Sequence, residues 1–249
     1  MIKLTQDTRP DKDKPLAKPD KFGYVPAWSY STLKTFEECP YRIYISKVKR
    51  IQKSFGPAAE RGSNIHQEAE DFVNGKLTEL PSSLAKFKTE FIKLKDLYTE
   101  GKVELEGEWA FTIDWEKTGW LNDNCWARIK LDAYVQEDKT AARVIDYKTG
   151  KKIGNEISHS QQCLLYAIAA FMRNPELEYV NSELWYLDQD QTSIMPYTRE
   201  EALLFLPNIH ERAIVMTTTE TFDPNPSKNN CKWCSYKKGP EPQCQWGAE

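Results

Sequence analysis

The sequence predicts a mixed α+β fold in which helices flank a central mixed β-sheet. The first hundred residues carry apolar side chains at helical spacing, whereas five later segments alternate apolar and polar residues with a period near two. Helical segments separate some of these strands, a pattern that favours a sheet with helices packed against it. We expect a helical N-terminal portion before the sheet and a cysteine cluster after it.

Composition supports one large folded unit. Of the 249 residues, 40% are hydrophobic and 29% are charged, so the chain can bury a substantial core. Residues 1–27 hold four prolines among alternating charges, so we expect an extended arm there and a single domain over residues 28–249. No apolar run approaches the roughly 18 residues of a membrane span, and the first residues lack the apolar stretch of a secretion signal. We therefore expect a cytoplasmic protein with no membrane partner.

Helices dominate the first hundred residues. Ser29 or Ser31 can cap the first helix, and Pro40 suits the first turn of the second. We predict helices at Tyr30–Glu37, Tyr41–Val48, Pro57–Val73 and Ser82–Thr99. The segment 57–99 is expected to form a helical roof over a cleft.

Strand-like patterns begin after Gly101. We predict strands at Val103–Ile113, Cys125–Val135, Ala142–Tyr147, Tyr179–Leu187 and Thr192–Tyr197. The first two are joined by a polar loop that contains Gly119 and Asn122, so they are expected to pair as a hairpin. Two further helices are predicted at Ser158–Met172 and Arg199–Val215.

Acidic and basic side chains gather at two of these strands. Asp146 and Lys148 are two residues apart, so both side chains leave the same face of a strand, and a hairpin partner can bring Asp132 beside them. Two close carboxylates repel each other unless a hard cation such as Mg²⁺ or Mn²⁺ neutralises them. A nearby lysine can orient a water molecule, so this set suits phosphodiester hydrolysis. The alternative is a solvated ion pair at a strand end.

A histidine on a predicted helix could add an imidazole ligand. His66 and Glu70 are four residues apart and share one helix face, and Gly62 nearby permits close backbone approach. The alternative is a surface histidine paired with Glu70. His159 and His210 have no comparable setting, and we assign them no role.

Two other features suit contact with nucleic acid. Gln162 and Tyr166 share a helix face, where an amide and a phenol can contact phosphate, although ordinary half-buried helix residues have the same pattern. Residues 1–53 hold twelve lysines and arginines against six acidic residues, while the whole chain has a net charge of -3. This distribution favours a local basic surface over nonspecific coating of nucleic acid.

The cysteines form a pattern typical of metal or cluster ligands. Two residues separate Cys231 from Cys234, nine separate Cys234 from Cys244, and Cys39 stands alone near the start. Such soft ligands suit either tetrahedral zinc or an iron–sulfur cluster. With Cys39 as the fourth ligand, the site would join the two ends of the chain; alternatively, segment 231–244 forms a local knuckle and Cys39 is merely buried.

Taken together, these residues resemble the RecB-like nuclease branch of the PD-(D/E)XK superfamily over residues 28–246. That branch includes CRISPR-associated adaptation exonucleases and small phage exonucleases. Its Ser-rich helix and Cys-Pro-aromatic element resemble the stretches at Ser29 and Cys39. The other motif positions follow in the family's order: Gly62 and His66, Asp132, Asp146 and Lys148, Gln162 and Tyr166.

The resemblance implies a restriction-endonuclease-like sheet around a Mg²⁺ or Mn²⁺ site. The implied metal ligands are His66, Asp132, Asp146 and the Tyr147 carbonyl. Lys148 would complete the catalytic set, and Gln162 with Tyr166 would contact DNA. The family also carries a glutamate on its first strand, which could be Glu106 or Glu108, and Glu108 has the better local context.

The resemblance further implies a 4Fe-4S cluster on Cys39, Cys231, Cys234 and Cys244, with structural Zn²⁺ as the alternative. The expected function is a metal-dependent DNA exonuclease that acts in recombination, repair or phage DNA metabolism, in the cytoplasm of a bacterium or phage-infected cell. A helicase or recombination protein is a candidate partner. The alternatives are a non-catalytic DNA-binding module built on the cysteine cluster and a spacer-processing nuclease of the CRISPR-adaptation type.

Overall fold

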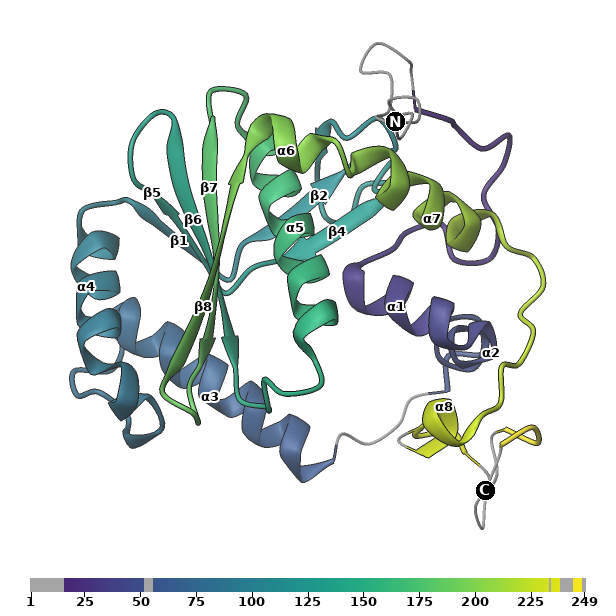
Figure 1. The fold of residues 1–249 in the computed structure, drawn as a ribbon, viewed down its shortest axis with the longest axis horizontal. Coiled ribbons are helices and arrows are strands. Elements are labelled where there is room, and N and C mark those ends of the chain that lie inside the picture. The colour runs from purple at the N-terminus through teal and green to yellow at the C-terminus, as the bar shows by residue number, and fades with distance from the viewer. Residues whose placement is uncertain (1–15, 52–55, 233, 238–243, 248–249) are drawn as a thin grey trace, which may run out of the picture.

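A computed structural model describes residues 16–51, 56–232, 234–237 and 244–247. It confirms the predicted α+β architecture, with helices around a central mixed sheet (Figure 1). The strands are β1 (Val103–Leu105), β2 (Glu108–Phe111), β3 (Lys117–Thr118), β4 (Ala127–Lys130), β5 (Ala133–Gln136), β6 (Ala141–Lys148), β7 (Tyr179–Tyr186) and β8 (Gln191–Thr198).

The strands form two sheets. The central sheet has the order β1-β5-β6-β7-β8, and a smaller sheet has the order β3-β2-β4. Only the β6–β7 pair is parallel among the named strands; α5 (Glu156–Arg173) supplies the crossover between these two strands. The carboxyl end of β6, which carries the predicted Asp-x-Lys pair, therefore leads directly toward the start of α5.

Helices make up most of the remaining described chain. They are α1 (Tyr30–Glu38), α2 (Pro40–Ile43), the π-helix η1 (Tyr44–Val48), α3 (Pro57–Val73), the 3₁₀-helix η2 (Ser82–Phe87), α4 (Lys88–Thr99), α6 (Arg199–Leu203), α7 (Leu206–Thr218) and α8 (Lys228–Lys232). Within the described ranges, no helix combines the length and apolar character needed to cross a membrane.

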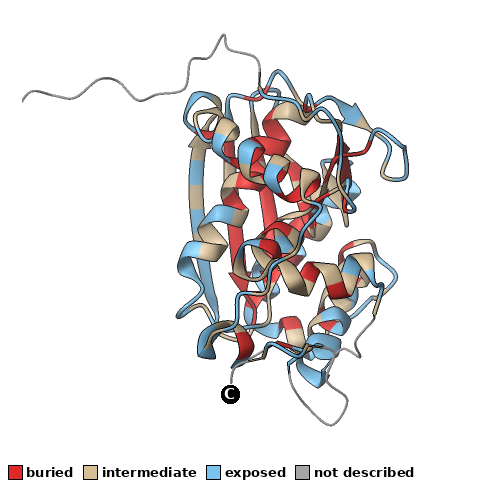
Figure 2. Cartoon of the chain, turned by 90° about the vertical axis from the view of Figure 1, so that its right-hand side faces the viewer, coloured by how far each residue is buried: buried red, intermediate tan, exposed pale blue. Residues whose placement is uncertain are grey.

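Alternating side chains give the central sheet two apolar faces. On β6, Ile145 and Tyr147 pack with residues of α3 and α4, whereas Val144 packs with residues of α5. Figure 2 shows the buried residues concentrated in the strands and on the helix sides that face them. The catalytic candidates lie at the end of this buried strand, so their backbone is held by core packing on both sides.

The predicted hairpin Val103–Ile113/Cys125–Val135 is wrong in one respect, because the chain breaks in both arms and contributes to two sheets. β1 pairs with β5 in the central sheet, while β2 pairs with β4 in the smaller one. The first break contains Glu106, whose φ of 48° is incompatible with an extended strand. The second break contains Asp132, so the transition between the sheets places this carboxylate at the edge of the core.

Three predicted helices differ in detail. The predicted helix Ser82–Thr99 begins as the 3₁₀-helix η2, and the predicted helix Tyr41–Val48 begins at Pro40 and ends in the π-helix η1. The predicted helix Arg199–Val215 is divided into α6 and α7, because Pro207 starts a new helix at its first turn. By contrast, α3 has the predicted bounds.

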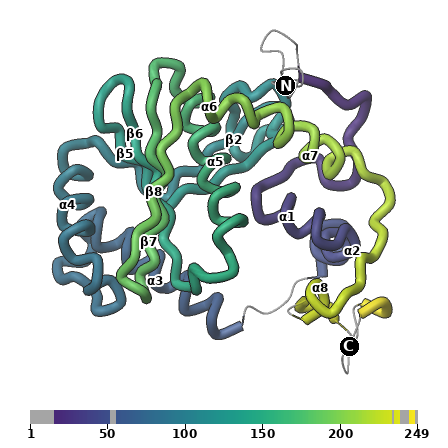
Figure 3. The backbone as a smooth tube through the Cα atoms, viewed as in Figure 1, coloured from purple at the N-terminus to yellow at the C-terminus, as the bar shows by residue number. Residues whose placement is uncertain are grey.

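The described part of the predicted arm, residues 16–27, lies along α7, whereas residues 1–15 lie outside the described residues. Gly23 donates its N–H to the Thr217 carbonyl at 2.6 Å, and a Cβ at this glycine would lie 2.1 Å from the Thr219 oxygen. His210 is buried and contacts the Ala17 carbonyl, a structural setting that agrees with its having no assigned role. Figure 3 shows this N-terminal segment beside α7, so the start of the described chain lies next to a helix from its last fifth.

Candidate active site

The candidate site begins where α3 meets the end of the central sheet. His66 Nδ1 lies 2.9 Å from Asp132 Oδ1, so the helix face contacts the sheet break and not Glu70. The alternative of a surface His66–Glu70 ion pair is therefore wrong. Close packing makes this contact possible, because a Cβ added to Gly62 would lie only 3.1 Å from Thr149 Oγ1 in the turn after β6.

The register of β5 and β6 places Asp132 opposite Asp146. Ala133 pairs with Ile145, so the preceding residue of one strand faces the following residue of the other. Asp132 Oδ2 accepts the Tyr147 backbone N–H at 2.6 Å, which fixes this carboxylate against β6. Burial, followed by the charge of Asp146, nevertheless raises the pKa of Asp132 despite its bonds to His66 and Tyr147.

Burial and neighbouring charges shift the pKa of His66 in opposite directions, and the charges prevail. Burial alone would lower the pKa of His66, but the hydrogen bond with Asp132 and the charges of Asp132 and Asp146 outweigh it and raise the pKa. Two acidic groups thus concentrate negative potential on one imidazole. This is a site that attracts a cation.

Glu106 is the third member of this cluster. Oxygen or nitrogen atoms of His66, Glu106 and Asp132 lie within 4.8 Å of one another, the only such grouping of metal-ligand side chains in the described part of the chain. Glu108, which has the better sequence context, is instead exposed on β2. The left-handed backbone at Glu106, whose N–H donates to the Asp132 carbonyl at 3.0 Å, brings its side chain to the cluster.

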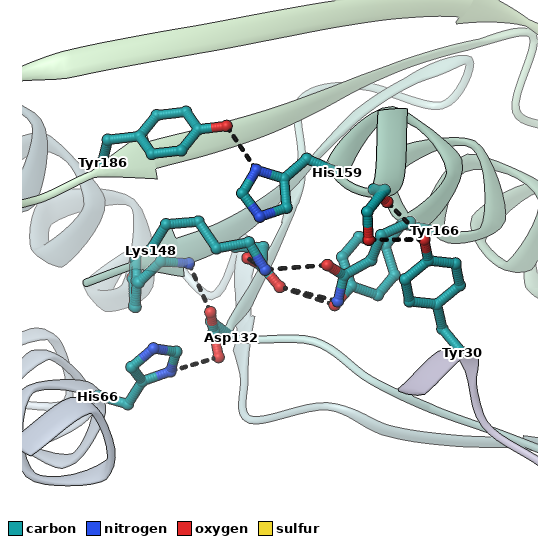
Figure 4. Close-up of polar contacts among 11 residues, drawn as sticks. Tyr30, His66, Asp132, Lys148, His159, Tyr166 and Tyr186 are labelled. Atoms are coloured by element: carbon teal, nitrogen blue, oxygen red, sulfur yellow. Dashed lines mark hydrogen bonds and ion pairs between the residues drawn. The ribbon is translucent and has the colours of Figure 1, made fainter. Parts of the chain in front are cut away.

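Asp146, Lys148, Gln162 and Tyr166 form a closed polar ring next to this cluster (Figure 4). Lys148 Nζ lies 2.5 Å from Asp146 Oδ2 and donates to Gln162 Oε1 at 2.9 Å. Gln162 Nε2 contacts Tyr166 Oη at 2.6 Å, and that hydroxyl donates to Asp146 Oδ1 at 2.7 Å.

The ring fixes the protonation of one member and pairs one buried oxygen with an ammonium. Burial raises the pKa of Tyr166 well above its usual value, so its hydroxyl remains a donor to Asp146. Asp146 Oδ2 is buried and receives no hydrogen bond of good geometry from the described residues, although the Lys148 ammonium lies close. This oxygen therefore already pairs with one cation, the Lys148 ammonium.

Sequence reasoning assigned no role to His159, which the structure places beside this ring. Its Nδ1 lies 2.8 Å from the Tyr186 hydroxyl, and burial followed by the Lys148 charge lowers the pKa of His159. The imidazole is therefore neutral at pH 7. A signal was present in the sequence, because His159 precedes Gln162 by three residues and shares its side of α5.

All four predicted cluster cysteines line one pocket at the opposite end of the molecule from the central sheet. The pocket lies between the end of α1, α2 and the C-terminal segment, and it contains Cys39, Cys231, Cys234 and Cys244. Burial, followed by the charges of the other three thiols, raises the pKa of Cys244. Residues 233 and 238–243 of the predicted segment 231–244 lie outside the described residues.

Hydrogen bonds from the C-terminal segment hold it against α1. The Asn225 and Asn230 side-chain amides donate to the Glu38 carbonyl at 3.0 Å and 2.9 Å. The Asn225 N–H also approaches Cys39 Sγ at 3.4 Å. Distant parts of the sequence therefore meet at the cysteine pocket. Cys39 lines the pocket together with the C-terminal cysteines, so the pocket is not formed by segment 231–244 alone.

The residues of the site fit a hard divalent cation. Carboxylate oxygens and one imidazole are ligands that Mg²⁺ and Mn²⁺ accept, and a lysine stands close to the same carboxylates. A cation of this kind neutralises carboxylates and polarises a phosphoryl oxygen. Fold and site together thus define the class: a metal-dependent hydrolase built at the end of a mixed sheet.

Comparison with known proteins agrees with this class. The sequence profile of the PD-(D/E)XK nuclease superfamily matches residues 27–122 and 127–238, and the chain belongs to this superfamily. A solved structure described as "Crystal structure of SSO0001" is similar at 18% identity, with 84% of this chain and 83% of that chain covered and a TM-score of 0.48. No curated protein matched the chain.

We predict that Asp132→Asn stabilises the metal-free protein while removing metal-induced stabilisation. The folded pKa of Asp132 lies above its ordinary value of 3.8, so ionisation costs the metal-free protein stability as the pH rises through that value. Asn cannot ionise, and it retains a partner for His66. Thermal unfolding at pH 7 in EDTA should show a rise of about 2–4 °C, and the rise caused by Mn²⁺ should disappear.

The matched control is Asp123→Asn, because Asp123 is exposed in the loop between β3 and β4. This variant should unfold at the wild-type temperature with and without Mn²⁺. Mn²⁺ stabilisation of the Asp132 variant equal to that of wild type would exclude Asp132 as a metal ligand.

Proposed function

We propose that this protein is a metal-dependent DNA exonuclease. The observation that carries the proposal is the juxtaposition of the His66–Glu106–Asp132 cluster with the Asp146–Lys148 pair at the end of β6. Membership of the nuclease superfamily supports hydrolysis of phosphodiester bonds. The basic character of residues 1–53 supports a nucleic-acid substrate.

The proposed metal is Mg²⁺ or Mn²⁺, bound by His66, Asp132, Asp146 and the Tyr147 carbonyl, with Glu106 as a further ligand. When bound, this ion supplies charge that stabilises the phosphate during attack and lowers the pKa of bound water. The raised pKa of Asp132 supports this ligand set, because burial and the nearby charge of Asp146 leave that carboxylate short of positive charge.

Lys148 is the proposed catalytic cation of the chain itself. Its ammonium would orient the attacking water and stabilise negative charge that develops on the phosphate oxygens. Gln162 holds the ammonium through its Oε1, and Tyr166 holds Asp146 through its hydroxyl. We propose that Gln162 and Tyr166 also contact the DNA strand, once substrate opens the polar ring.

The four-cysteine pocket is proposed to hold a structural 4Fe-4S cluster. All four cysteines line the same pocket, which brings Cys39 together with the C-terminal three. Four thiol ligands suit an iron–sulfur cluster, and structural Zn²⁺ is the alternative.

The proposed setting is the processing of DNA ends in recombination, repair or phage DNA metabolism, in the cytoplasm of a bacterium or an infected cell. A helicase or recombination protein is the proposed kind of partner, since an exonuclease that acts on duplex ends benefits from strand separation. Two alternative functions remain to be tested against this proposal. A non-catalytic DNA-binding module would cleave no DNA, and a spacer-processing nuclease would form different products.

Asp146→Ala should abolish cleavage and leave the fold intact. The variant removes a proposed metal ligand and the partner of Lys148, so we expect a loss of at least about 100-fold, the size typical for losing one charge-stabilising group. The assay follows end-labelled single-stranded and duplex DNA with Mn²⁺ or EDTA, and Asp123→Ala serves as the matched exposed control. Time-resolved product sizes distinguish exonuclease from endonuclease action.

Each outcome of this assay separates the candidate functions. Mononucleotides or short products released progressively from one end support the exonuclease, whereas a few defined internal products support a spacer-processing nuclease. A salt-sensitive gel shift without cleavage by the wild type indicates the binding module. Full activity in Asp146→Ala refutes the proposed site.

Anaerobic purification should yield a brown protein with broad absorbance near 400 nm and about four irons per chain, as expected for a four-cysteine iron–sulfur site. Cys39→Ser should lower the iron content, because the N-terminal ligand is lost. Cys125→Ser is the control, since Cys125 is a buried residue just before β4 and outside the pocket. A colourless protein that contains one zinc per chain would reject the cluster and leave the nuclease proposal unaffected.

A further inference from the structure

A row of polar side chains leads from the catalytic ring along α5 toward α1. Ser158, Gln162 and Tyr166 follow one another at four-residue intervals, so they lie on one face of the helix. Gln162 and Tyr166 contact the residues of the ring, whereas Ser158 lies one turn closer to the start of α5. The row therefore continues beyond the proposed site of hydrolysis by roughly 6 Å along the helix axis.

Ser158 is the meeting point of two donors from α1. Lys34 Nζ donates to Ser158 Oγ at 2.8 Å, and the Tyr30 hydroxyl donates to the Ser158 carbonyl at 2.6 Å. Tyr30 Oη also lies 3.1 Å from Ser158 Oγ. Figure 4 shows Tyr30 on the far side of the ring from His66. We call Tyr30, Lys34 and Ser158 the α1–α5 donor cluster.

Lys34 carries a positive charge with little local compensation. Its nearest carboxylate partner is Glu38 at 3.9 Å, and the other oxygen of Glu38 lies 2.8 Å from Arg42. Several other surface lysines have closer carboxylates; Lys76, for example, lies 3.0 Å from Asp71. The Lys34 side chain is 42% exposed at the edge of the site.

Both hydroxyl groups of the donor cluster can complement this charge. Burial raises the pKa of Tyr30, so the phenol stays protonated at neutral pH, and its proton can turn from the Ser158 carbonyl to a ligand. The Ser158 hydroxyl can rotate to donate to a ligand. One ammonium and two neutral hydroxyls are the kind of donor set that proteins use to contact DNA phosphates.

We propose that Tyr30, Lys34 and Ser158 form a subsite for the phosphate next to the scissile phosphate of the DNA strand. This inference rests on the proposed function, which defines the phosphate that lies at Lys148. A strand held at both places would follow the row Ser158–Gln162–Tyr166. Lys34 supplies charge to this subsite, and Tyr30 with Ser158 supplies directional hydrogen bonds.

A purely structural role for the donor cluster makes a different prediction. If these contacts only hold α1 against α5, then Lys34→Ala lowers the unfolding temperature and leaves DNA affinity unchanged. If they bind phosphate, the half-exposed Lys34 can be removed with little effect on unfolding, while affinity for DNA falls. Thermal unfolding is therefore measured beside binding.

The test measures binding of fluorescent single-stranded DNA by anisotropy, with Ca²⁺ in place of Mg²⁺ or Mn²⁺ so that binding is read apart from turnover. Lys34→Ala should raise Kd about tenfold at low salt and reduce the slope of log Kd against log salt by about 1. Lys88→Ala is the matched control, because Lys88 is an exposed lysine on α4, away from α5. It should bind as the wild type does.

The decisive arm replaces single phosphates of the DNA with uncharged methylphosphonates. One position should weaken wild-type binding about tenfold yet have little effect on Lys34→Ala, because the same contact cannot be lost twice. Tyr30→Phe should show a smaller coupling at the same position. If the losses of affinity caused by Lys34→Ala and by a methylphosphonate simply add at every phosphate position, the subsite is overturned. An unchanged Kd for Lys34→Ala would overturn it as well.

The outcomes for the two proposals are distinguishable. Cleavage by the wild type with Mn²⁺ but no coupling at any phosphate rejects the subsite and leaves the nuclease proposal intact. Coupling at one phosphate, in a protein that cleaves no DNA, rejects the nuclease proposal and retains a phosphate site at Lys34.

Discussion

The structure depends on placing two carboxylates, Asp132 and Asp146, opposite each other at the buried end of adjacent strands. Such a pair is costly to ionise, and the raised pKa of Asp132 expresses that cost. His66, the Tyr147 N–H, Lys148 and Tyr166 each offset part of it. A divalent cation would offset the remaining repulsion between the two carboxylates. The repulsion in the metal-free site is therefore the reason why we expect the site to bind a metal ion.

The break between the two sheets builds this arrangement. β1 and β5 stay in the central sheet while β2 and β4 turn away, and the two connecting points contain Glu106 and Asp132. The positive φ of Glu106 removes it from the strand and brings its carboxylate toward His66. The two strand pairs share one register, in which Glu106 stands opposite Asp132, and the Glu106 N–H donates to the Asp132 carbonyl. The left-handed backbone at Glu106 therefore lies within the site itself.

Sequence predicted the elements whose signals are local and missed those set by tertiary structure. The bounds of α3 were predictable because Pro57 and Asn74-Gly75 mark its ends, and Asp146 with Lys148 were predictable from strand alternation. The break at Glu106 was not predicted, although Gly107 beside it is a residue that often marks a bulge or bend in a strand. With the strand taken as continuous, the apolar residues that follow Glu108 gave Glu108 the better context. His159 was missed because its contact with Tyr186 joins α5 to a distant strand.

The proposed metal site is tested most directly by the position of a bound Mn²⁺ ion, located by anomalous X-ray scattering from crystals grown with MnCl₂. We predict one strong peak among His66, Glu106, Asp132 and Asp146, within about 2.0–2.3 Å of carboxylate oxygens, as expected for a hard divalent ion. A peak elsewhere, or Asp132 and Asp146 turned away from a common ion, would contradict it.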